Sequence, residues 1–283
     1  MASPPDTVGA ELEAGARVLG RPAALQTWAA VTRTAPGAAW LASGDPPPAA
    51  DIVRRFRDAV AQQARGTPLA TAVGLAAFRT LELRVDPRVL IPRPETEGLV
   101  DTVLAWARRR GGSGIALDLG TGSGAIALSL AAEGAFERII ASDVSPDALA
   151  VARGNRAAVA GGPPVEFRCG AWFDPLAGLV ADVVVSNPPY LTSDECDALD
   201  PSVRDYEPRL ALDAGPDGLE HIRAILNGAG RHLAAGGLLA LEIDSRRAGV
   251  TLACARASGW RNARVATDAF GRDRYLLATK DET

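Results

Sequence analysis

Ile115-Ala116-Leu117-Asp118-Leu119-Gly120-Thr121-Gly122-Ser123-Gly124 is the stretch of sequence that decides the fold. Residues 115–119 form a short apolar run with the length of a buried strand, and residues 125–132 read as a helix that begins directly after the glycines. The three glycines permit a tight turn and let a ligand approach the backbone with no Cβ in the way. A helix N-terminus at this point presents backbone N–H groups.

The sequence on both sides of this stretch alternates between strands and helices. Further strands are expected at 138–142, 165–168, 182–186, 238–243, 263–267 and 274–278, and helices at 97–109, 147–160, 219–233 and 248–257. Ser145 and Pro146 have the residue types of an N-cap and a first-turn proline, and Gly236-Gly237 reads as the turn before the fifth strand. Such alternation predicts a mostly parallel sheet covered on both faces. Only residues 268–273 join the last two strands, too few for a parallel crossover, so these two are expected to pair antiparallel.

The N-terminal part of the chain has a different character. Residues 1–78 contain no strand-like run, and helical spacing at 23–30 and 52–63 predicts a small helical domain. Residues 79–94 are expected to form a β-hairpin linker, with strands at 81–85 and 89–91 around an Asp86-Pro87 turn. The α/β domain then occupies residues 95–283. The predicted fold class is thus α/β and Rossmann-like, with about seven strands, an antiparallel last strand and an added helical domain.

Composition excludes several classes of protein. Of the 283 residues, 47% are hydrophobic and 23% charged, which is ordinary for a globular protein with a real core. No run approaches the roughly 20 apolar residues of a membrane span, and residues 1–13 do not read as a signal peptide, so a cytoplasmic protein is expected. A net charge of −4 argues against an extended nucleic-acid surface.

Cysteines and histidines are too few and too scattered for a metal site. The three cysteines are widely spaced, and they indicate neither a zinc site nor a disulfide framework. The two histidines, His221 and His232, are expected on the outer faces of one helix. No metal ligand is therefore assigned.

The second strand ends in Asp143, 23 residues after Gly120. An acidic side chain at this place can accept hydrogen bonds from ribose hydroxyls in nucleoside-binding α/β folds. Alone, Asp143 can equally well cap the helix that starts after Ser145. A dinucleotide site prefers a glycine at position 125, where this chain has the alanine that a looser fingerprint permits, so glycine spacing by itself does not choose the ligand. The glycine loop and Asp143 together favour a nucleoside.

Asn187-Pro188-Pro189-Tyr190 follows the fourth strand directly, at the sheet edge where ligands bind in open α/β folds. The prolines fix the backbone and leave the Pro188 carbonyl as a rigid acceptor. The side-chain oxygen of Asn187 is a second acceptor, and Tyr190 offers an aromatic face. Two acceptors at fixed separation can hold the two hydrogens of an –NH2 group. The tetrad therefore predicts a site that aims a planar amide or amine nitrogen at an electrophile, and no general base is evident nearby.

At this point the chain resembles the glutamine N5-methyltransferases that modify peptide-chain release factors. The resemblance covers about residues 53–279. Its pieces are Arg65-Gly66-Thr67-Pro68-Leu69, Val89-Leu90-Ile91-Pro92-Arg93-Pro94-Glu95-Thr96-Glu97, the loop 118–124, Val185-Ser186-Asn187-Pro188-Pro189-Tyr190, Tyr206-Glu207-Pro208, Asp217-Gly218-Leu219 and Gly271-Arg272-Asp273-Arg274. The Arg-Pro-Glu-Thr-Glu segment is the most specific, because the Asn-Pro-Pro-Tyr tetrad also occurs in enzymes that modify adenine.

The resemblance implies a class I methyltransferase fold, S-adenosyl-L-methionine as cofactor and a release factor as the protein substrate, methylated on a glutamine in a Gly-Gly-Gln loop. The N-terminal domain would recognise that substrate, and a monomer is expected. By likeness the cofactor would be bound by Gly120, Thr121, Gly122, Ser123, Gly124, Asp143, Trp172 and Asn187. The tetrad 187–190 would bind the glutamine and carry catalysis.

Three positions depart from the family pattern. Ala171 precedes Trp172 where an acidic residue is usual, Asp244 replaces the glycine of Glu-Ile-Gly after the fifth strand, and residues 70–74 lack the usual tyrosine. The competing interpretations are the same chemistry on a nucleic-acid base or on a small-molecule or peptide amide, a non-catalytic cofactor-binding subunit, and a nicotinamide-dependent dehydrogenase. An intact tetrad argues against the subunit, and the lack of a hydride-site acid or base argues against the dehydrogenase.

Overall fold

The computed structural model describes residues 7–112 and 114–282. The chain divides into two compact units. One consists of the N-terminal part up to Leu75 together with the short segment 200–206, and the other of residues 76–199 and 207–283. The return of 200–206 to the N-terminal unit is a feature that the sequence pattern does not reveal. No helix in the described part of the chain is long and apolar enough to cross a membrane.

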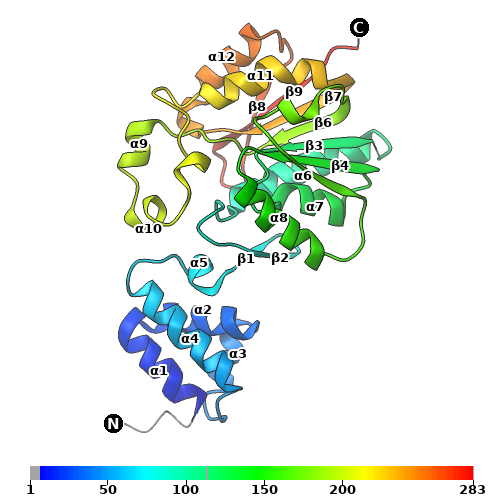
Figure 1. Cartoon of the computed structure of the whole chain (residues 1–283). Helices are drawn as coiled ribbons and strands as arrows, with labels where there is room; N and C mark the ends of the chain where they lie inside the picture. The colour runs from blue at the N-terminus through cyan, green and yellow to red at the C-terminus, as the bar shows by residue number, and fades with distance from the viewer. Residues whose placement is uncertain (1–6, 113, 283) are drawn as a thin grey trace. The chain divides into compact units, whose positions relative to one another are not determined.

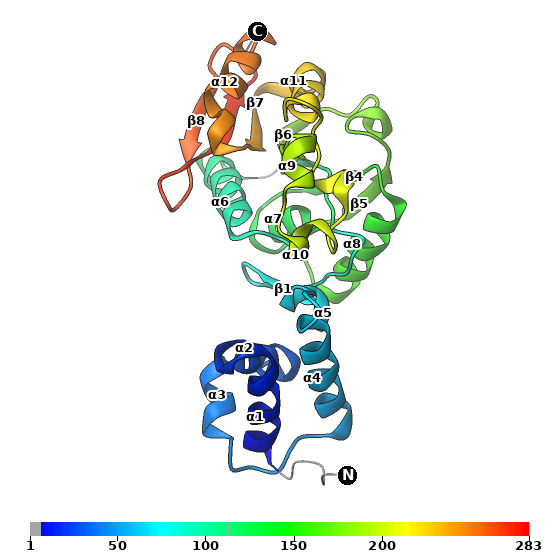
Figure 2. The same ribbon diagram turned by 90° about the vertical axis from the view of Figure 1, so that its left-hand side faces the viewer.

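The N-terminal unit is a small helical bundle. Its helices are α1 (Val8–Leu19), α2 (Arg21–Thr32), α3 (Pro36–Leu41), α4 (Ala50–Gln63), α5 (Leu69–Val73) and α10 (Pro201–Arg204). In Figure 2, α1 and α2 lie beside α4, and α3 packs against α2. Trp28 and Phe56 meet edge to face at the centre, with ring centroids 4.9 Å apart. Since both side chains are almost fully buried, this unit has a hydrophobic core of its own.

A two-stranded hairpin follows, but not where the sequence pattern places it. Its strands are β1 (Leu75–Phe78) and β2 (Leu81–Arg84), and residues 89–91 form no strand. The turn falls at Arg79, a non-glycine residue with a φ of 53°, which carries no sequence signal for a turn. Tertiary contacts hold it instead: the Arg79 amide donates to Glu97 at 3.0 Å and its guanidinium to Glu133 at 2.7 Å. The predicted second strand was therefore wrong, whereas Asp86 does begin a turn.

Seven strands form the sheet of the second unit, in the order β5-β4-β3-β6-β7-β9-β8. They are β3 (Ile115–Leu119), β4 (Arg138–Asp143), β5 (Val165–Cys169), β6 (Ala181–Ser186), β7 (Leu233–Glu242), β8 (Arg264–Thr267) and β9 (Asp273–Thr279). The strands from β5 to β7 pair parallel, and β9 pairs antiparallel with both β7 and β8. The predicted sheet, with its antiparallel last strand, is confirmed.

The fifth parallel strand is longer than predicted. Gly236 and Gly237 lie inside β7, opposite a register shift between Ala181 and Val183, and do not form a turn before the strand. The shift is possible because Gly236 adopts a φ of 69°, and its backbone pairs with Lys280 instead of continuing the ladder to β6.

Helices cover both faces of the sheet (Figures 1 and 2). They are α6 (Pro94–Arg109), α7 (Ala125–Glu133), α8 (Pro146–Ala158), α11 (Glu220–His232) and α12 (Ala248–Ala257), whereas the short helix α9 (Ser193–Asp197) belongs to the connection between β6 and α11. α6 and α7 share one buried cluster with the hairpin residues Phe78 and Leu83. α11 and α12 build the cluster on the opposite face. As predicted, Ser145 caps α8 by accepting from the Ala148 amide at 3.1 Å.

Candidate active site

The glycine loop leaves the carboxyl end of β3 and leads into α7. Gly120, Gly122 and Gly124 all have positive φ, of 69°, 54° and 86°, which explains why the sequence places glycine at these three positions. Their neighbours saturate much of the loop backbone. The amides of Gly120 and Thr121 donate to the Ser142 carbonyl at 2.8 and 3.0 Å.

Two carboxylates accept hydrogen bonds from other donors of the loop and of the helix that follows it. Asp143 Oδ2 accepts from the Gly122 amide at 2.9 Å, and Asp118 Oδ2 accepts from Thr121 Oγ1 at 2.6 Å and from the Ala127 amide at 3.1 Å. A pyrophosphate needs free N–H groups and positive potential at such a loop. Here the amides of Gly120, Thr121, Gly122 and Gly124 already donate within the protein, and the acidic side chains at the loop are those of Asp118 and Asp143. The arrangement therefore opposes a dinucleotide and suits a nucleoside that carries positive charge.

Burial perturbs both carboxylates. Desolvation raises the pKa of Asp118 to about 7, although the hydrogen bonds from Thr121 and Ala127 oppose it. It also raises the pKa of Asp143, against the amides of Ser145 and Gly122. Asp118 Oδ1 is buried with no hydrogen-bond partner among the described residues. A cationic ligand in this loop would relieve the electrostatic cost of both groups.

Of the two roles predicted for Asp143, the structure shows the contact at the start of α8, together with a bond to the glycine loop. Oδ1 accepts from the Ser145 amide at 2.9 Å, so the side chain does brace the start of α8, while Oδ2 holds the loop. Each carboxylate oxygen offers two lone pairs, and one on each stays available to a ligand.

A cavity of about 250 Å³ lies beside these groups. It is lined by Arg88, Val89, Leu90, Gly120, Gly122, Asp143, Val144, Ser145, Ala148, Gly170, Ala171, Trp172, Asn187, Pro189, Pro208, Leu210, Ala211 and His221. The lining is polar at Asp143 and apolar at Val144, Ala148, Ala171 and Trp172. This division matches a nucleoside, whose ribose is polar and whose base is flat and apolar on its faces.

The cavity separates the predicted site residues into two groups. Gly120, Gly122, Asp143, Trp172, Asn187 and Pro189 line it, whereas Thr121, Ser123, Gly124, Pro188 and Tyr190 lie outside its lining. Thr121 and Ser123 are buried and act on the loop itself: Thr121 bonds Asp118, and the Ser123 carbonyl accepts from Asn155 at 2.8 Å.

Trp172 has an unusual backbone. Its φ is 43°, which is strained for a side chain of this size. Its carbonyl accepts from Ser142 Oγ at 3.1 Å, and its ring lies so near the loop that a Cβ at Gly120 would approach it to 3.6 Å. Backbone strain of this kind clusters at functional sites, and Trp172 lines the cavity.

The two histidines are not on outer faces, so that prediction was wrong. His221 lines the cavity with its ring centroid 5.3 Å from that of Trp172, and its Nε2 lies 3.1 Å from the Asp213 carbonyl. His232 stacks on Phe173 with centroids 4.6 Å apart, and its Nδ1 lies 2.9 Å from the Leu179 carbonyl. Both imidazoles find backbone carbonyls to bond, which helical periodicity alone does not show.

The Asn-Pro-Pro-Tyr tetrad begins where β6 ends and is held by two side chains that the sequence analysis did not single out as site residues. Asn187 Nδ2 lies 3.0 Å from Thr96 Oγ1, which is 2.7 Å from Glu242 Oε2. Tyr190 Oη donates to the other oxygen of Glu242 at 3.3 Å. Burial raises the pKa of Glu242 to about 7, and the same burial with the nearby Glu242 charge raises the pKa of Tyr190 above its ordinary value.

Hydrogen bonds within this unit join three of the places that carry the family resemblance: residues 89–97, Glu207 and residues 271–274. Glu207 accepts from the Ile91 amide at 3.1 Å and from Arg93 at 2.5 Å. The Glu95 carboxylate accepts from Arg272 at 2.8 Å, and its carbonyl accepts from Tyr275 at 2.7 Å. These bonds fix the first turn of α6, and with it Thr96.

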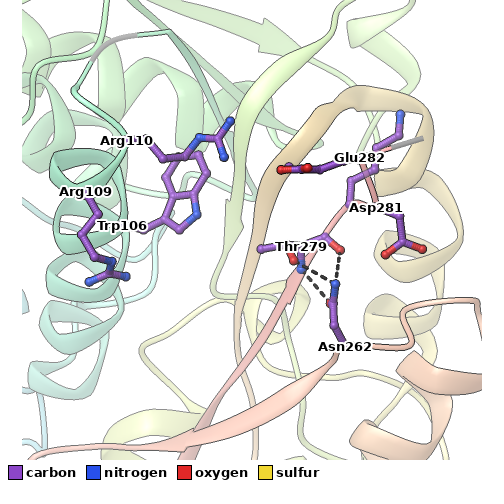
Figure 3. A pocket seen from close by; sticks show the side chains of 9 residues that line it. Trp106, Arg109, Arg110, Asn262, Thr279, Asp281 and Glu282 are labelled. Atoms are coloured by element: carbon purple, nitrogen blue, oxygen red, sulfur yellow. Dashed lines mark hydrogen bonds between the residues drawn. The ribbon is translucent and has the colours of Figure 1, made fainter.

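A second cavity, of about 340 Å³, lies at the opposite edge of the sheet (Figure 3). Arg110 lies over the Trp106 ring at 5.3 Å on one side, and Asn262 is bonded to Thr279 on the other. The glycine loop and the tetrad are at the carboxyl edge of the parallel strands, where ligands bind in open α/β sheets. The first cavity is therefore the candidate active site.

Known proteins share this fold and part of this sequence. Residues 99–199 match the family model described as Methyltransferase small domain. A methyltransferase structure from Pyrococcus furiosus superposes with a TM-score of 0.54 at 20% identity, covering 72% of this chain and 91% of that one. A Thermus thermophilus 16S rRNA N2 G1207 methyltransferase gives 0.51 at 18% identity, covering 73% and 49%. The fold is thus that of the class I methyltransferases.

Sequence relatives are more specific. A release factor glutamine methyltransferase of Cereibacter sphaeroides is 43% identical over 233 residues, which cover 82% of this chain and 81% of the relative. One from Moorella thermoacetica is 45% identical over 229 residues, covering 81% and 80%. The chain belongs to the release factor glutamine methyltransferase family. It is an S-adenosyl-L-methionine-dependent methyltransferase, as the sequence resemblance implied.

Proposed function

We propose that this enzyme transfers a methyl group from S-adenosyl-L-methionine to the side-chain amide nitrogen of a glutamine in a peptide-chain release factor, within its Gly-Gly-Gln loop. The observation that carries the proposal is that Asn187 lines the candidate cofactor cavity while its Nδ2 bonds to Thr96. Its Oδ1 is then left as an acceptor for a substrate N–H. The names of the relatives support the release factor as substrate.

The residues of this chain fit the cofactor. The glycine loop and Asp143 would hold the nucleoside part, and Val144, Ala171 and Trp172 would contact the base. The buried carboxylates Asp118 and Asp143 provide negative potential for a ligand with a positive centre. When bound, the cofactor supplies an electrophilic methyl group that carries its own leaving group.

Catalysis by the protein then consists mainly of orientation. An amide nitrogen is a poor nucleophile because its lone pair is delocalised. Asn187 Oδ1 and the Pro188 carbonyl would each accept one hydrogen of the glutamine –NH2, which returns electron density to the nitrogen and fixes its direction. No hydrogen bond from the described residues occupies the Pro188 carbonyl oxygen. Orientation of this kind supplies on the order of 7–11 kcal/mol of barrier lowering.

We further propose that the N-terminal unit recognises the release factor and that the enzyme acts in the cytoplasm as a monomer. The unit has its own core and contributes none of the residues that line the candidate active site. We therefore assign to the N-terminal unit the role of binding the protein partner.

Mass spectrometry of a purified release factor, incubated with the enzyme and isotopically labelled S-adenosyl-L-methionine, tests the proposal. One labelled methyl group is expected on the glutamine of the Gly-Gly-Gln loop. A release factor with that glutamine replaced by alanine is the control and should stay unlabelled. Label in RNA or in a small-molecule fraction, with none in the release factor, would replace the proposed acceptor by a base amine or a small amide.

A further inference from the structure

The side chain of Asn187 has two chemically opposite ends, and only one of them can serve the proposed reaction. Its oxygen accepts hydrogen bonds and its nitrogen donates them. If the nitrogen faced the substrate, it would oppose the –NH2 group that the site has to hold. Something in the protein must therefore decide which end faces the cavity, and the backbone of the tetrad does not.

The deciding contacts run through two buried residues. Thr96, in the first turn of α6, is 4% exposed, and Glu242, at the end of β7, is 1% exposed. Strands β6 and β7 pair in register with Ser186 opposite Leu241, so the next residues, Asn187 and Glu242, leave adjacent strands at the same level. Thr96 lies between them, with Oγ1 3.0 Å from Asn187 Nδ2 and 2.7 Å from Glu242 Oε2.

The direction of each hydrogen bond follows from the carboxylate. An ionised carboxylate only accepts, so the single hydroxyl hydrogen of Thr96 must point to Glu242. Thr96 Oγ1 then presents lone pairs alone to Asn187, and only an –NH2 group can bond to it. The Asn187 oxygen consequently faces away from Thr96.

Tyr190 connects the far end of the tetrad to the same group. Its hydroxyl donates to Glu242 Oε1 at 3.3 Å, so the two oxygens of one carboxylate hold the first and last residues of the tetrad, one through Thr96 and one directly. Between them, Pro188 and Pro189 have a fixed φ. A single buried acid thus controls both the polarity and the span of this loop.

We propose that Glu242 and Thr96 are positioning residues that set the orientation of the Asn187 side-chain amide, holding its oxygen toward the substrate. The inference rests on the proposed function in that Asn187 is taken to accept from the glutamine –NH2. Neither residue touches substrate or cofactor in this account. Both act through Asn187.

Thr96→Val and Thr96→Ser form the matched pair that tests this. Valine has the shape of threonine without the hydroxyl, and serine keeps the hydroxyl. Thr96→Val should lower the single-turnover rate of methyl transfer to the release factor on the order of 10- to 100-fold, the equivalent of one charge-assisted hydrogen bond. Thr96→Ser should recover most of that loss. The affinity for S-adenosylhomocysteine should stay within about twofold in both, since the glycine loop and Asp143 are unaltered.

Thr251→Val is the control for replacing a buried threonine. Thr251 is fully buried in α12, and its hydroxyl has no partner among the described residues. The methyl-transfer rate of Thr251→Val should therefore equal that of the unaltered enzyme. A rate for Thr96→Val equal to that of Thr96→Ser would overturn the positioning role. Parallel losses of rate, cofactor affinity and melting temperature in Thr96→Val would overturn it too, because they would indicate a structural role only.

An NMR measurement on the enzyme alone, with no methyl acceptor present, tests the orientation of Asn187 independently of the proposed function. The chain has only four asparagines, Asn155, Asn187, Asn227 and Asn262, so selective ¹⁵N labelling gives four side-chain amide pairs in an NMR spectrum. The pair absent from Asn187→Ala identifies Asn187. Its protons should shift and exchange faster with solvent in Thr96→Val, and not in Thr251→Val. Unaltered Asn187 signals in Thr96→Val would contradict the inference even if the release factor proved not to be the substrate.

Discussion

Asp143 Oδ2 accepts a hydrogen bond from the Gly122 amide at 2.9 Å, so the acid at the end of β4 holds the same glycine loop that lines the cofactor cavity. The bond explains why the two features occur together in the sequence. The Gly122 amide needs an acceptor, and in a dinucleotide-binding protein a phosphate oxygen would accept from an amide at such a loop. Here a carboxylate fills that position permanently, and the cavity is left suited to a phosphate-free nucleoside.

Replacement of Asp143 should weaken cofactor binding through the loss of this bond and of the proposed ribose contact together. Asp143→Ala should cost roughly 1.5–3 kcal/mol of binding free energy, the value of a hydrogen bond to a charged group, and Asp143→Asn should cost less because one acceptor oxygen remains. Isothermal titration with S-adenosylhomocysteine measures both. Ser145→Ala removes the side-chain cap of α8 but keeps the Ser145 amide that donates to Asp143, so it is the control for a weakened start of α8. An equal loss in the Ser145 variant would show that the helix start, not the ligand contact, matters.

Ala171 is the departure from the family pattern that lies nearest the ligand. It lines the cavity next to Trp172 and cannot accept a hydrogen bond from the amine of a bound adenine. Ala171→Asp should therefore tighten binding of S-adenosylhomocysteine by about 0.5–3 kcal/mol without changing the substrate. Calorimetric titration of both forms decides it, with Ala171→Ser as the uncharged comparison. Equal or weaker binding by the Asp variant would mean that the cavity is built around alanine, with His221 as a candidate acceptor in its place.

The sheet could be predicted from the sequence because its signals are local. Buried runs such as 115–119, the Ser145 cap and the short connection before β9 each fix an element or a pairing with no need of distant residues. The hairpin could not be placed in the same way. Its turn at Arg79 depends on Glu97 and Glu133, which are 18 and 54 residues away.

The candidate site shows the same division. The glycines and Asp143 have residue types that their own backbone positions require, so they stand out in the sequence. Thr96 and Glu242 are ordinary residues of a helix and a strand. They become part of the site only because a helix start and a strand end, 146 residues apart, are brought within hydrogen-bond distance of Asn187.

Two glycines of α11 should respond oppositely to the same substitution. A Cβ at Gly228 would lie 2.4 Å from the Phe173 ring, whereas a Cβ at Gly230 would meet nothing within 4 Å. Gly228→Ala should destabilise the protein by about 1–3 kcal/mol through overpacking. Gly230→Ala should stabilise it by up to about 1 kcal/mol, because alanine is the better helix former. Urea unfolding of both variants checks the signs, and a stabilised Gly228→Ala would show that Phe173 moves aside freely.

Glu242→Gln should stabilise the protein in a pH-dependent way. Burial raises the pKa of Glu242 from 4.5 to about 7, so folding favours its protonated form. The stability contributed by this group is complete below about pH 4.5 and is lost as the pH rises through about 7. Glutamine does not titrate, so the variant should gain on the unaltered protein between pH 5 and pH 8 by on the order of 2–3 kcal/mol. Urea unfolding at both pH values measures this, with the exposed Glu137→Gln as control. A gain that is the same at both pH values would contradict the raised pKa.

The rate of methyl transfer should also depend on the ionisation of Glu242. Ionisation lowers the stability of the protein, but it should raise the rate. Ionised Glu242 accepts from Thr96 and Tyr190 at once, while the protonated acid carries a hydrogen of its own and no longer dictates the direction of the Thr96 hydroxyl. The charged groups that act on it are Arg274, which favours ionisation, and Glu95, which opposes it. We therefore expect the single-turnover rate to fall as the pH drops through about 7.

Asp118 has a pKa of about 7 as well, but it lies under the glycine loop and should affect cofactor affinity instead. Saturating cofactor and release factor at every pH removes its contribution from the measured rate. Under those conditions Glu242→Gln should be slower than the unaltered enzyme at pH 8. The fall in its rate as the pH drops through about 7 should also disappear. If the rate of the variant still falls near pH 7, another group titrates in the transfer step, and Glu242 does not set the orientation of Asn187 through its charge.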